Sequence, residues 1–563
     1  MKRIVIVFSI LVFWGSLCDG QSWVWGAEAK YQCCNGNNGA SADSKGNVYL
    51  TGDFEDTISF GSISLTESLP SVYLAKYDSN GNILWASQST TPSPNCGASA
   101  YSIACDGSDN TYVCGYFQTG TLILGADTLY NSSVYGDIFL MRSTPNGNVI
   151  WAKQSTTIPS SSSGGRAISL ACDDSGHIYT TGSFLGSVTF GSTTTLTGPS
   201  IFLVKYDTLG NVIWSRQATN HNQRLINSNS VAVDHFGNTY ITGYFSDTVY
   251  FGSTLLKSNS KYGDLFLTKY SPSGNVLWAI QSNTKTDTDY THGASVICDT
   301  KGDVYVTGMY NGQSTIGSDT FRTSYYKTEA FLTKYDSMGN FLWAESSECN
   351  YGAQGYSLAI SNNQLFLSAS AGYTKTAAIG FCGDSLNLNN SLDPAIILKL
   401  DTGGKALCGS IIRTGGTFQN NVVCSTNGKY VYLGGNQMDS IAFYKDTLRL
   451  TGRLGSAPFV ARWNPCGSIT GIDQINSVES KIQVFPNPNS GIFTIALGHP
   501  ADNAGEKTRA EIYNVMGQRV KSEELRAKSE EIDLSNQPSG IYFYRVIDTR
   551  GGLLGEGKLI IQK

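Results

Sequence analysis

A short phrase of glycine, asparagine, two apolar residues and tryptophan recurs along the chain and constrains its fold more than any other feature. Complete copies occupy residues 81–86, 147–152, 210–215, 274–279 and 339–344. The tryptophans follow one another at spacings of 66, 63, 64 and 65 residues, and Cys408 takes the tryptophan position 65 residues after Trp343. A constant period of this length indicates one repeated structural unit rather than several unrelated domains.

A second phrase lies between these copies, as in residues 48–52, and is found seven times. Both phrases are short runs of β-branched and aromatic residues bounded by Gly, Asn, Asp or Ser, which are strand and turn signals. Residues 43–47 and 78–82 are typical tight turns. Four short strands per unit, repeated seven times, predict an all-β, seven-bladed β-propeller over residues 21–471. The pattern resembles the β-propeller repeat family of bacterial exported proteins.

The strand count predicts how such a ring would close. The seventh unit lacks a good fourth strand, whereas residues 22–27 resemble that strand before the first unit begins. Trp25 precedes Trp85 by 60 residues, which is close to one repeat. We therefore expect residues 22–27 to be the outermost strand of the seventh blade, antiparallel to residues 459–463. Such a closed ring would leave no inner edge exposed.

The N-terminus has the pattern of a signal peptide over residues 1–20. Lys2 and Arg3 precede an apolar run at residues 4–14 that is too short to span a bilayer. An alternative is a lipoprotein signal acylated at Cys18. No later run of 18 apolar residues predicts a transmembrane helix. The net charge of −5 argues against binding to nucleic acid or anionic membranes.

After a linker at residues 472–480 the repeat stops, and residues 481–563 form a separate segment whose alternating runs predict a small C-terminal β-sandwich. Its phrases resemble the type A C-terminal sorting domain of type IX secretion. The resemblance implies a cell of the Bacteroidota type, export to the periplasm and passage across the outer membrane. It also implies the type IX secretion machinery as a partner, with the mature protein secreted or held on the outer-membrane surface. The residues that match the pattern are Pro486, Asn487, Pro488, Gly491, Gly517, Gly540 and Lys558.

The cysteines divide into two groups. Cys105, Cys172, Cys298 and Cys424 occupy one equivalent repeat position, where we expect small buried side chains because equivalent positions in different blades are too far apart to be bridged. Loop cysteines are better candidates for disulfides in an exported chain. These are Cys33, Cys34, Cys96 and Cys349.

No pattern in the sequence predicts catalysis. The five histidines have no metal-ligand spacing, and no nucleophile elbow or phosphate-binding loop is present. Turn chemistry explains the repeated Asp and Asn residues without calcium, which needs six to eight oxygen ligands. We therefore expect no metal and no cofactor.

The variable loops that precede each unit's first strand are the predicted functional surface, because function gathers on loops held by a rigid scaffold. The candidate ligand-binding residues there are Tyr31, Arg166, Arg224, Tyr290, His292 and Tyr351. The leading hypothesis is a non-enzymatic surface or secreted module that binds a glycan or a protein. The alternatives are an exported hydrolase or lyase that uses the propeller centre, and a structural surface-coat protein.

Overall fold

The computed structural model describes residues 22–94, 96–132, 136–157, 164–192, 194–219, 225–324, 327–349, 352–372, 378–381, 384–387, 392–414, 417–424, 428–443, 449–465, 482–497, 508–514, 518–525, 529–547 and 553–563. Every regular element in them is a β-strand. The chain forms two compact units, residues 1–467 and 468–563. The predicted signal peptide and linker lie outside the described residues.

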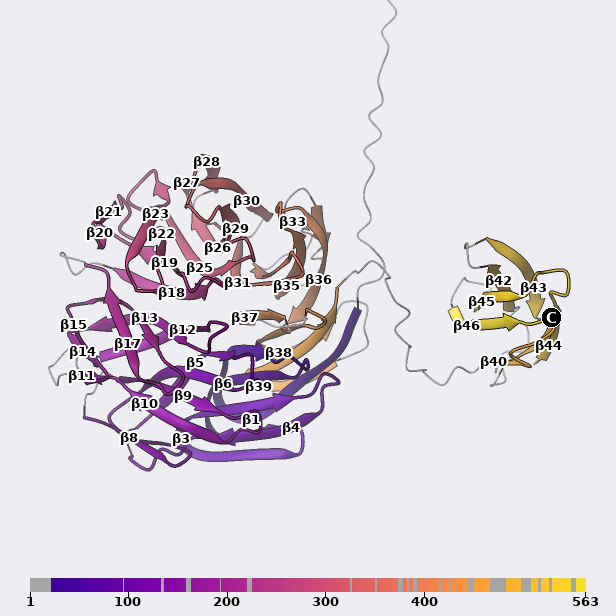
Figure 1. Ribbon diagram of the computed structural model, residues 1–563, viewed down its shortest axis with the longest axis horizontal. Coiled ribbons are helices and arrows are strands. Elements are labelled where there is room, and N and C mark those ends of the chain that lie inside the picture. The colour runs from indigo at the N-terminus through magenta and orange to yellow at the C-terminus, as the bar shows by residue number, and fades with distance from the viewer. Residues whose placement is uncertain are drawn as a thin grey trace, which may run out of the picture. The chain divides into compact units, whose positions relative to one another are not determined.

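In the first unit, consecutive antiparallel strands form repeating groups of four (Figure 1). The first two groups are β1 (Ser22–Ala42), β2 (Val48–Phe60), β3 (Ile63–Tyr77) and β4 (Ile83–Gln88), then β5 (Ala98–Cys105), β6 (Thr111–Phe117), β9 (Asp137–Ser143) and β10 (Val149–Gln154). The next two are β12 (Gly164–Cys172), β13 (Ile178–Leu185), β16 (Ser200–Tyr206) and β17 (Val212–Gln217), then β18 (Ile226–Val233), β19 (Thr239–Phe245), β22 (Asp264–Tyr270) and β23 (Val276–Gln281).

Two further groups follow the same order, and the last has three strands of its own. They are β25 (Tyr290–Cys298), β26 (Val304–Asn311), β29 (Thr328–Tyr335) and β30 (Phe341–Cys349), then β31 (Ala353–Ser361), β32 (Gln364–Ala371), β35 (Leu392–Asp401) and β36 (Ala406–Thr414). The last three strands are β37 (Thr417–Cys424), β38 (Val431–Phe443) and β39 (Arg449–Asn464).

The long strand β1 belongs to two groups. Its C-terminal half pairs with β2, and its N-terminal half pairs antiparallel with β39, where Trp23 lies opposite Trp463 and Ala27 opposite Val460. The predicted pairing of residues 22–27 with residues 459–463 is therefore confirmed. It joins strands that lie more than four hundred residues apart in the sequence.

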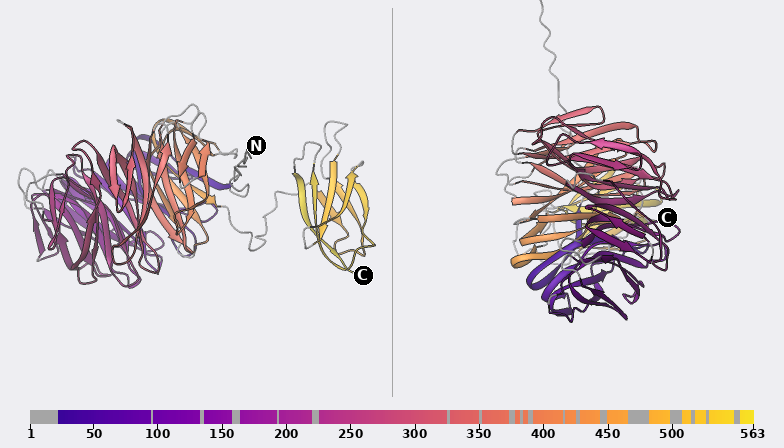
Figure 2. Two further views of the ribbon diagram at one scale, coloured as in Figure 1. Left: turned by 90° about the horizontal axis from the view of Figure 1, so that it is seen from above. Right: turned by 90° about the vertical axis from the view of Figure 1, so that its left-hand side faces the viewer.

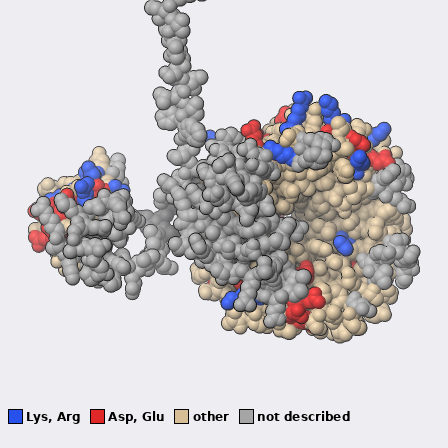
Figure 3. All heavy atoms as spheres, turned by 180° about the vertical axis from the view of Figure 1, so that it is seen from behind, with Lys and Arg blue, Asp and Glu red and all other residues tan. Residues whose placement is uncertain are grey.

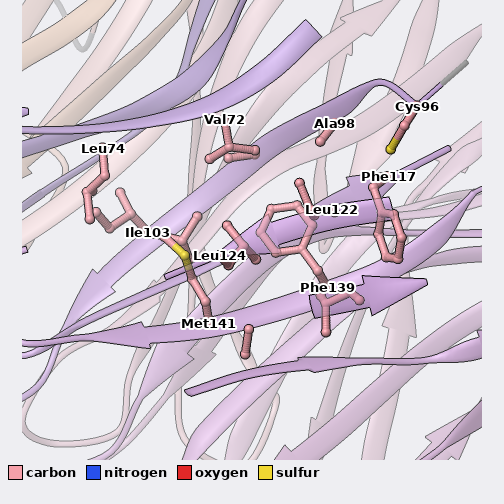
Figure 4. Close-up of a cluster of buried hydrophobic side chains, with 14 of the residues drawn as sticks. Val72, Leu74, Cys96, Ala98, Ile103, Phe117, Leu122, Leu124, Phe139 and Met141 are labelled. Carbon is pink, nitrogen blue, oxygen red and sulfur yellow. The ribbon is translucent and has the colours of Figure 1, made fainter. Parts of the chain in front are cut away.

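The first strands of the groups lie nearest one another (Figure 1). Each contacts the first strand of the next group, from β1 through β5, β12, β18, β25 and β31 to β37, and β37 in turn contacts β1. Buried clusters fill the space between neighbouring groups. Figure 4 shows one of them, in which Val72 and Leu74 of the first group face Phe139 and Met141 of the second.

Aspartate side chains build the tight turns. Asp43 Oδ1 accepts hydrogen bonds from the backbone N–H groups of Lys45 at 3.0 Å and Asn47 at 2.8 Å, and Tyr49 donates from its hydroxyl to Oδ2. The same arrangement recurs at Asp106, Asp173, Asp234 and Asp299. These bonds are the turn chemistry that the sequence predicts.

The connections between second and third strands carry additional hairpins, three of which turn at a Phe-Gly-Ser sequence, at residues 60–62, 190–192 and 251–253. In the first group the excursion is continuous with β2 and β3, with the turn at Gly61 and Ser62. Elsewhere it forms separate strands: β7 (Gly120–Leu124) with β8 (Asp127–Asn131), β14 (Ser187–Phe190) with β15 (Thr194–Thr197), β20 (Thr248–Phe251) with β21 (Thr254–Lys257), β27 (Gln313–Ile316) with β28 (Asp319–Arg322), and β33 (Ala378–Phe381) with β34 (Asp384–Asn387). The short strands β11 (Thr156–Thr157) and β24 (Asn283–Thr284) pair with β14 and β27.

A glutamine at the end of the fourth strand holds four of these excursions. Gln281 accepts a hydrogen bond of 2.8 Å from the backbone N–H of Lys257 and donates one of 2.7 Å to its carbonyl oxygen. The amide thus replaces a paired strand along the outer edge of the hairpin. The equivalent pairs are Gln88 with Thr66, Gln154 with Tyr130, and Gln217 with Thr197.

The cysteines correct one expectation. Cys96 and Cys349, which we considered disulfide candidates, are buried thiols that are not disulfide-bonded, whereas Cys408 is disulfide-bonded. Cys96 packs in the cluster of Figure 4, where burial raises the pKa of its thiol to about 11. The repeat-position residues Cys105, Cys172, Cys298 and Cys424 are free, as predicted, but they are half-buried rather than buried. Cys33 and Cys34 lie in β1, but their side chains are outside the described residues.

The second compact unit consists of two antiparallel sheets (Figure 2). One contains β40 (Ile482–Phe485), β41 (Ile492–Leu497) and β44 (Ser529–Asp533). The other contains β42 (Thr508–Asn514), β43 (Arg519–Leu525), β45 (Gly540–Ile547) and β46 (Leu553–Ile561). Both sheets contribute to one buried cluster that includes Phe493, Ile495, Ile512 and Val546.

Candidate functional site on the inner strands

The first strands of the groups share a β-bulge at one equivalent position. In β5 the register with β6 shifts between Ala100 and Ser102, so that Tyr101 is the extra residue. A bulge interrupts the alternation of side chains and redirects the residue it contains. The equivalent extra residues are Asn38, Ile168, Asn229, Ala294 and Tyr356.

Polar side chains at and after these bulges join each first strand to the next. Ser102 accepts a hydrogen bond of 3.2 Å from the backbone N–H of Leu170. The same contact joins Ser169 to Val231, Ser230 to Val296 and Ser295 to Leu358. Hydrogen bonds to backbone carbonyl groups continue the order around the remaining strands. Ser357 donates to the carbonyl of Val422, and Asn421 donates to the carbonyl of Asn38. Asn38 in turn donates from its side chain to the carbonyl of Ala100. The side chains nearby are therefore positioned by two neighbouring groups at once.

A carboxyl group lies at one end of the candidate site. Asp53, directly after the repeated Gly52 of β2, accepts a hydrogen bond of 2.9 Å from Asn38 Nδ2. Burial raises the pKa of Asp53 to about 6, and hydrogen bonds from Asn38 and Ser99 oppose that rise. The carboxyl therefore titrates much closer to neutral pH than an exposed aspartate.

Two stacked tyrosines and an arginine follow. The rings of Tyr101 and Tyr116 have centroids 5.7 Å apart and planes inclined by 13°. The guanidinium of Arg166 lies 4.7 Å from the centroid of the Tyr116 ring, a cation–π arrangement. Burial raises the pKa of the Tyr101 phenol to about 12, so this ring stays neutral. The tyrosine pair thus supports the arginine from one side.

Arg166 also lines a pocket of about 520 Å³ between β12, β13 and the start of β18. Ser183, Ser200 and Asn227 supply its other polar side chains, and Phe184 and Leu225 are among its apolar ones. A pocket of this size and mixed lining is typical of small-ligand sites. In the part of the face that Figure 3 colours, most Lys, Arg, Asp and Glu side chains lie toward the margin, and one cation lies within the area of other residues.

A second aromatic group adjoins the pocket through Asn227, whose amide donates a hydrogen bond of 2.8 Å to the hydroxyl of Tyr244. Tyr244 stacks on His292 with a centroid distance of 3.8 Å, and Tyr290 lies 4.9 Å from the same imidazole. His292 Nε2 lies 2.8 Å from the carbonyl oxygen of Tyr262. Burial lowers the pKa of His292, which favours the neutral ring. The two aromatic groups therefore flank one pocket.

The structure describes three of the predicted ligand-binding residues with their side chains. Arg166, Tyr290 and His292 lie in this region, but on strands β12 and β25 rather than in loops, because those strands begin earlier than the sequence indicates. Tyr31 lies in β1 opposite Ile58, but its side chain is outside the described residues. Arg224 and Tyr351 lie wholly outside the described residues.

Sequence reasoning missed Asn38, Asp53, Tyr101, Tyr116 and Tyr244. One signal could have found three of them. The residue directly after the repeated glycine of each second strand varies, as Asp53, Tyr116, Ser183, Tyr244 and Met309, although the phrase before it is nearly constant. Variation at one position of an otherwise constant repeat marks a side chain that the scaffold does not need.

Across the described part of the chain, no three His, Cys, Asp or Glu side chains are grouped as metal ligands. A search of the same residues finds no helix long and apolar enough to cross a membrane.

Several predicted sorting residues support the C-terminal strand of the second unit. Asn487, between Pro486 and Pro488, donates from its side-chain amide to the carbonyl of Lys558 and accepts from the N–H of Ile560, both at 2.8 Å. Gly491 has a φ of 109° and contacts Ser535 too closely for a side chain. Gly540 begins β45, and Gly517 is outside the described residues.

Two family models match the chain. Residues 483–562 match a secretion system C-terminal sorting domain, and residues 213–244 match a β-propeller repeat. Both matches confirm the resemblances identified in the sequence. The sorting domain indicates export by type IX secretion to the cell surface or the extracellular space.

Other similarities are distant. An uncharacterized WD repeat-containing protein of Acanthamoeba polyphaga mimivirus is 25% identical over 338 residues, which cover 48% of this chain and 24% of that protein. The chain thus spans about a quarter of the length of that curated relative.

Solved structures with similar folds include three bacterial proteins. A protein of unknown function from Dyadobacter fermentans has 10% identity over 80% of this chain and 100% of that chain, with a TM-score of 0.36. PorZ, a surface component of the type IX secretion system of Porphyromonas gingivalis, has 11% identity over 93% and 74%, with a TM-score of 0.25. A quinohemoprotein alcohol dehydrogenase from Comamonas testosteroni has 10% identity over 78% and 76%, with a TM-score of 0.37. Likenesses this remote carry no argument about activity.

Proposed function

We propose that this exported chain is a secreted or cell-surface β-propeller module that binds a glycan. The binding site would be the candidate site on the first strands of the groups, around the pocket that Arg166 lines. The observation that carries the proposal is the pair of aromatic groups, Tyr101 with Tyr116 and Tyr244 with His292, on either side of one pocket with a mixed polar and apolar lining. Flat aromatic rings beside amide and hydroxyl groups suit a sugar, which presents apolar C–H faces and a rim of hydroxyls. The module would act by binding, without a catalytic step of its own.

The test is a glycan array probed with the mature protein, followed by titration of any sugar that binds. The variants are Tyr116→Ala and Tyr244→Ala, with Tyr130→Ala as the matched control because the Tyr130 ring is 66% exposed on the hairpin strand β8. We expect each site variant to weaken binding by about tenfold, the loss typical of a contact worth 1–2 kcal/mol. Equal affinity of all four proteins would exclude this surface as the site.

A second candidate is a hydrolase or lyase that uses the same surface. The observation in its favour is the carboxyl of Asp53, which burial leaves with a pKa of about 6, near the range that suits a general acid or base. Release of new reducing or unsaturated ends from a bound oligosaccharide, abolished by Asp53→Asn, is the result that would establish it.

We also propose that the seven strand groups are the blades of one closed ring over residues 21–471, preceded by a signal peptide at residues 1–20 and followed by a linker at residues 472–480 and the sorting domain at residues 481–563. The support is the unbroken order of contacts among first strands, including that of β37 with β1. Low-resolution images of single particles averaged along the ring axis would test the sevenfold count.

A further inference from the structure

The charged lining of the pocket beside Arg166 is positive. Among the residues that the structure describes, Arg166 is the only charged side chain that lines the pocket, and no aspartate or glutamate contributes to its wall. The other polar side chains are neutral: Ser183, Ser200 and Asn227. A wall with one cation and neutral hydrogen-bonding groups favours an anionic group over a neutral or cationic one.

Arg166 differs from several other cations of the first unit, which lie beside carboxylates. Lys76 lies 3.1 Å from the carboxylate of Asp43, Arg142 lies 3.4 Å from that of Asp106, and Lys334 lies 2.8 Å from that of Asp303. Within the described residues no carboxylate lies within 4.0 Å of the Arg166 guanidinium. Its charge is therefore not used to hold a turn.

The guanidinium is also held in place. It rests on the Tyr116 ring at 4.7 Å, and Tyr116 is in turn stacked on Tyr101. A planar guanidinium supported on one face keeps its N–H donors directed outward from its edge, where they can contact two oxygens of one anion. The carboxyl group of Asp53 accepts a hydrogen bond from Asn38 instead.

We propose that this pocket receives the acidic group of a sugar, a carboxylate or a sulfate, and that Arg166 determines specificity for anionic glycans. The proposal rests on the glycan-binding function above and names its ligand class. Arg166 would form paired hydrogen bonds with two anion oxygens, while Asn227 and Ser183 would contact neighbouring sugar hydroxyls.

The experiment titrates the full mature protein with two matched pairs of oligosaccharides. Oligogalacturonate and its methyl ester differ in the carboxylate charge, and sulfated and unsulfated dextran oligosaccharides differ in sulfate. We expect the acidic member of at least one pair to bind about tenfold more tightly, because a hydrogen bond to a charged group is stronger than one between neutral groups. The pair that shows the difference identifies the acidic group.

Arg166→Gln is expected to remove that preference while neutral members bind as before, and Arg166→Lys to retain part of it. Arg322→Gln, at an exposed arginine on hairpin strand β28, is the control and is expected to keep the full preference. Equal binding of acidic and neutral members to the wild type, or an undiminished preference in Arg166→Gln, overturns the role of Arg166 but leaves glycan binding intact. Absence of binding to every probe and to the glycan array overturns both proposals.

Discussion

The indole N–H of Trp25 donates a hydrogen bond of 2.8 Å to the backbone carbonyl oxygen of Ser79, 54 residues further along the chain. Next to that carbonyl, Gly81 adopts a φ of 89°, and a Cβ there would come within 2.7 Å of the indole. Tryptophans of the fourth strands make the same contact with the next group: Trp85 with Pro145, Trp151 with Thr208, Trp214 with Pro272 and Trp278 with Ser337. The N-terminal strand therefore takes the place of a fourth strand beside β39.

Trp25→Ala tests this role. The change removes the indole packed on Gly81 and the bond to Ser79, and we expect the free energy of unfolding to fall by about 2–3 kcal/mol, since the indole is only partly buried. Val24→Ala is the control, because Val24 is 45% exposed on the same strand. Chemical denaturation of both variants gives the comparison, and an unchanged midpoint for Trp25→Ala would contradict the role.

Gln281→Ala tests the side-chain amides that hold the outer hairpins. It removes both hydrogen bonds to Lys257, and we expect a loss of about 1 kcal/mol because these bonds are exposed to water. Hydrogen exchange at Lys257 measures the local effect. Gln281→Glu keeps the acceptor but not the donor, so its exchange protection at Lys257 is expected to lie between those of the wild type and Gln281→Ala. Unchanged protection in Gln281→Ala would show that the amide contributes nothing.

Asp53→Asn tests the buried carboxyl. The pKa of Asp53 is raised from 3.8 to about 6, so between these pH values the folded state binds more protons than the unfolded state. We therefore expect wild-type stability to fall as pH rises from about 4 to 6 through this residue, and the asparagine variant to lack that component. Unfolding free energies at pH 4, 5, 6 and 7 give the two profiles, and profiles of the same slope would refute the assignment.

Glu511→Gln tests a carboxylate of opposite behaviour in the second compact unit. Hydrogen bonds from Tyr513, Arg545 and Arg519 lower its pKa to about 2, so the folded state favours the ionised form. The stabilisation is fully present above about 4.5 and is lost as pH falls toward 2. Thermal melting of residues 468–563 between pH 2 and 6 should show a steeper acid loss in the wild type than in Glu511→Gln.

Removal of residues 481–563 tests export. The first compact unit has its own buried clusters, so we expect the truncated chain to fold and to accumulate in the periplasm. Fractionation of cells and medium with an antibody against the first unit measures its location. Normal yield of the truncated protein at the surface or in the medium would show that the sorting domain is not the export signal.

Strands, turns and their repetition could be read from the sequence because their causes are local. Asp43 and Asn47 lie four residues apart and bond within their own turn, and each tryptophan phrase forms its own strand. Even the pairing of residues 22–27 with β39 could be predicted by counting strands. The seventh unit lacks a fourth strand of its own, and residues 22–27 resemble a fourth strand that belongs to no other unit. The sorting domain was equally accessible, because each of its short motifs, such as that at Pro486, Asn487 and Pro488, can be read from a few neighbouring residues.

The candidate site was decided by the tertiary structure. Asp53, Tyr116 and Arg166 come from three neighbouring groups, and their side chains share a surface only because each first strand contains a bulge and contacts the next strand. The state of Cys96 and Cys349 was decided in the same way, since each thiol is packed in a buried cluster to which two neighbouring groups contribute. The direction of a side chain after a bulge, and the distance between residues of different groups, depend on long-range packing, and a local sequence period contains no information about either.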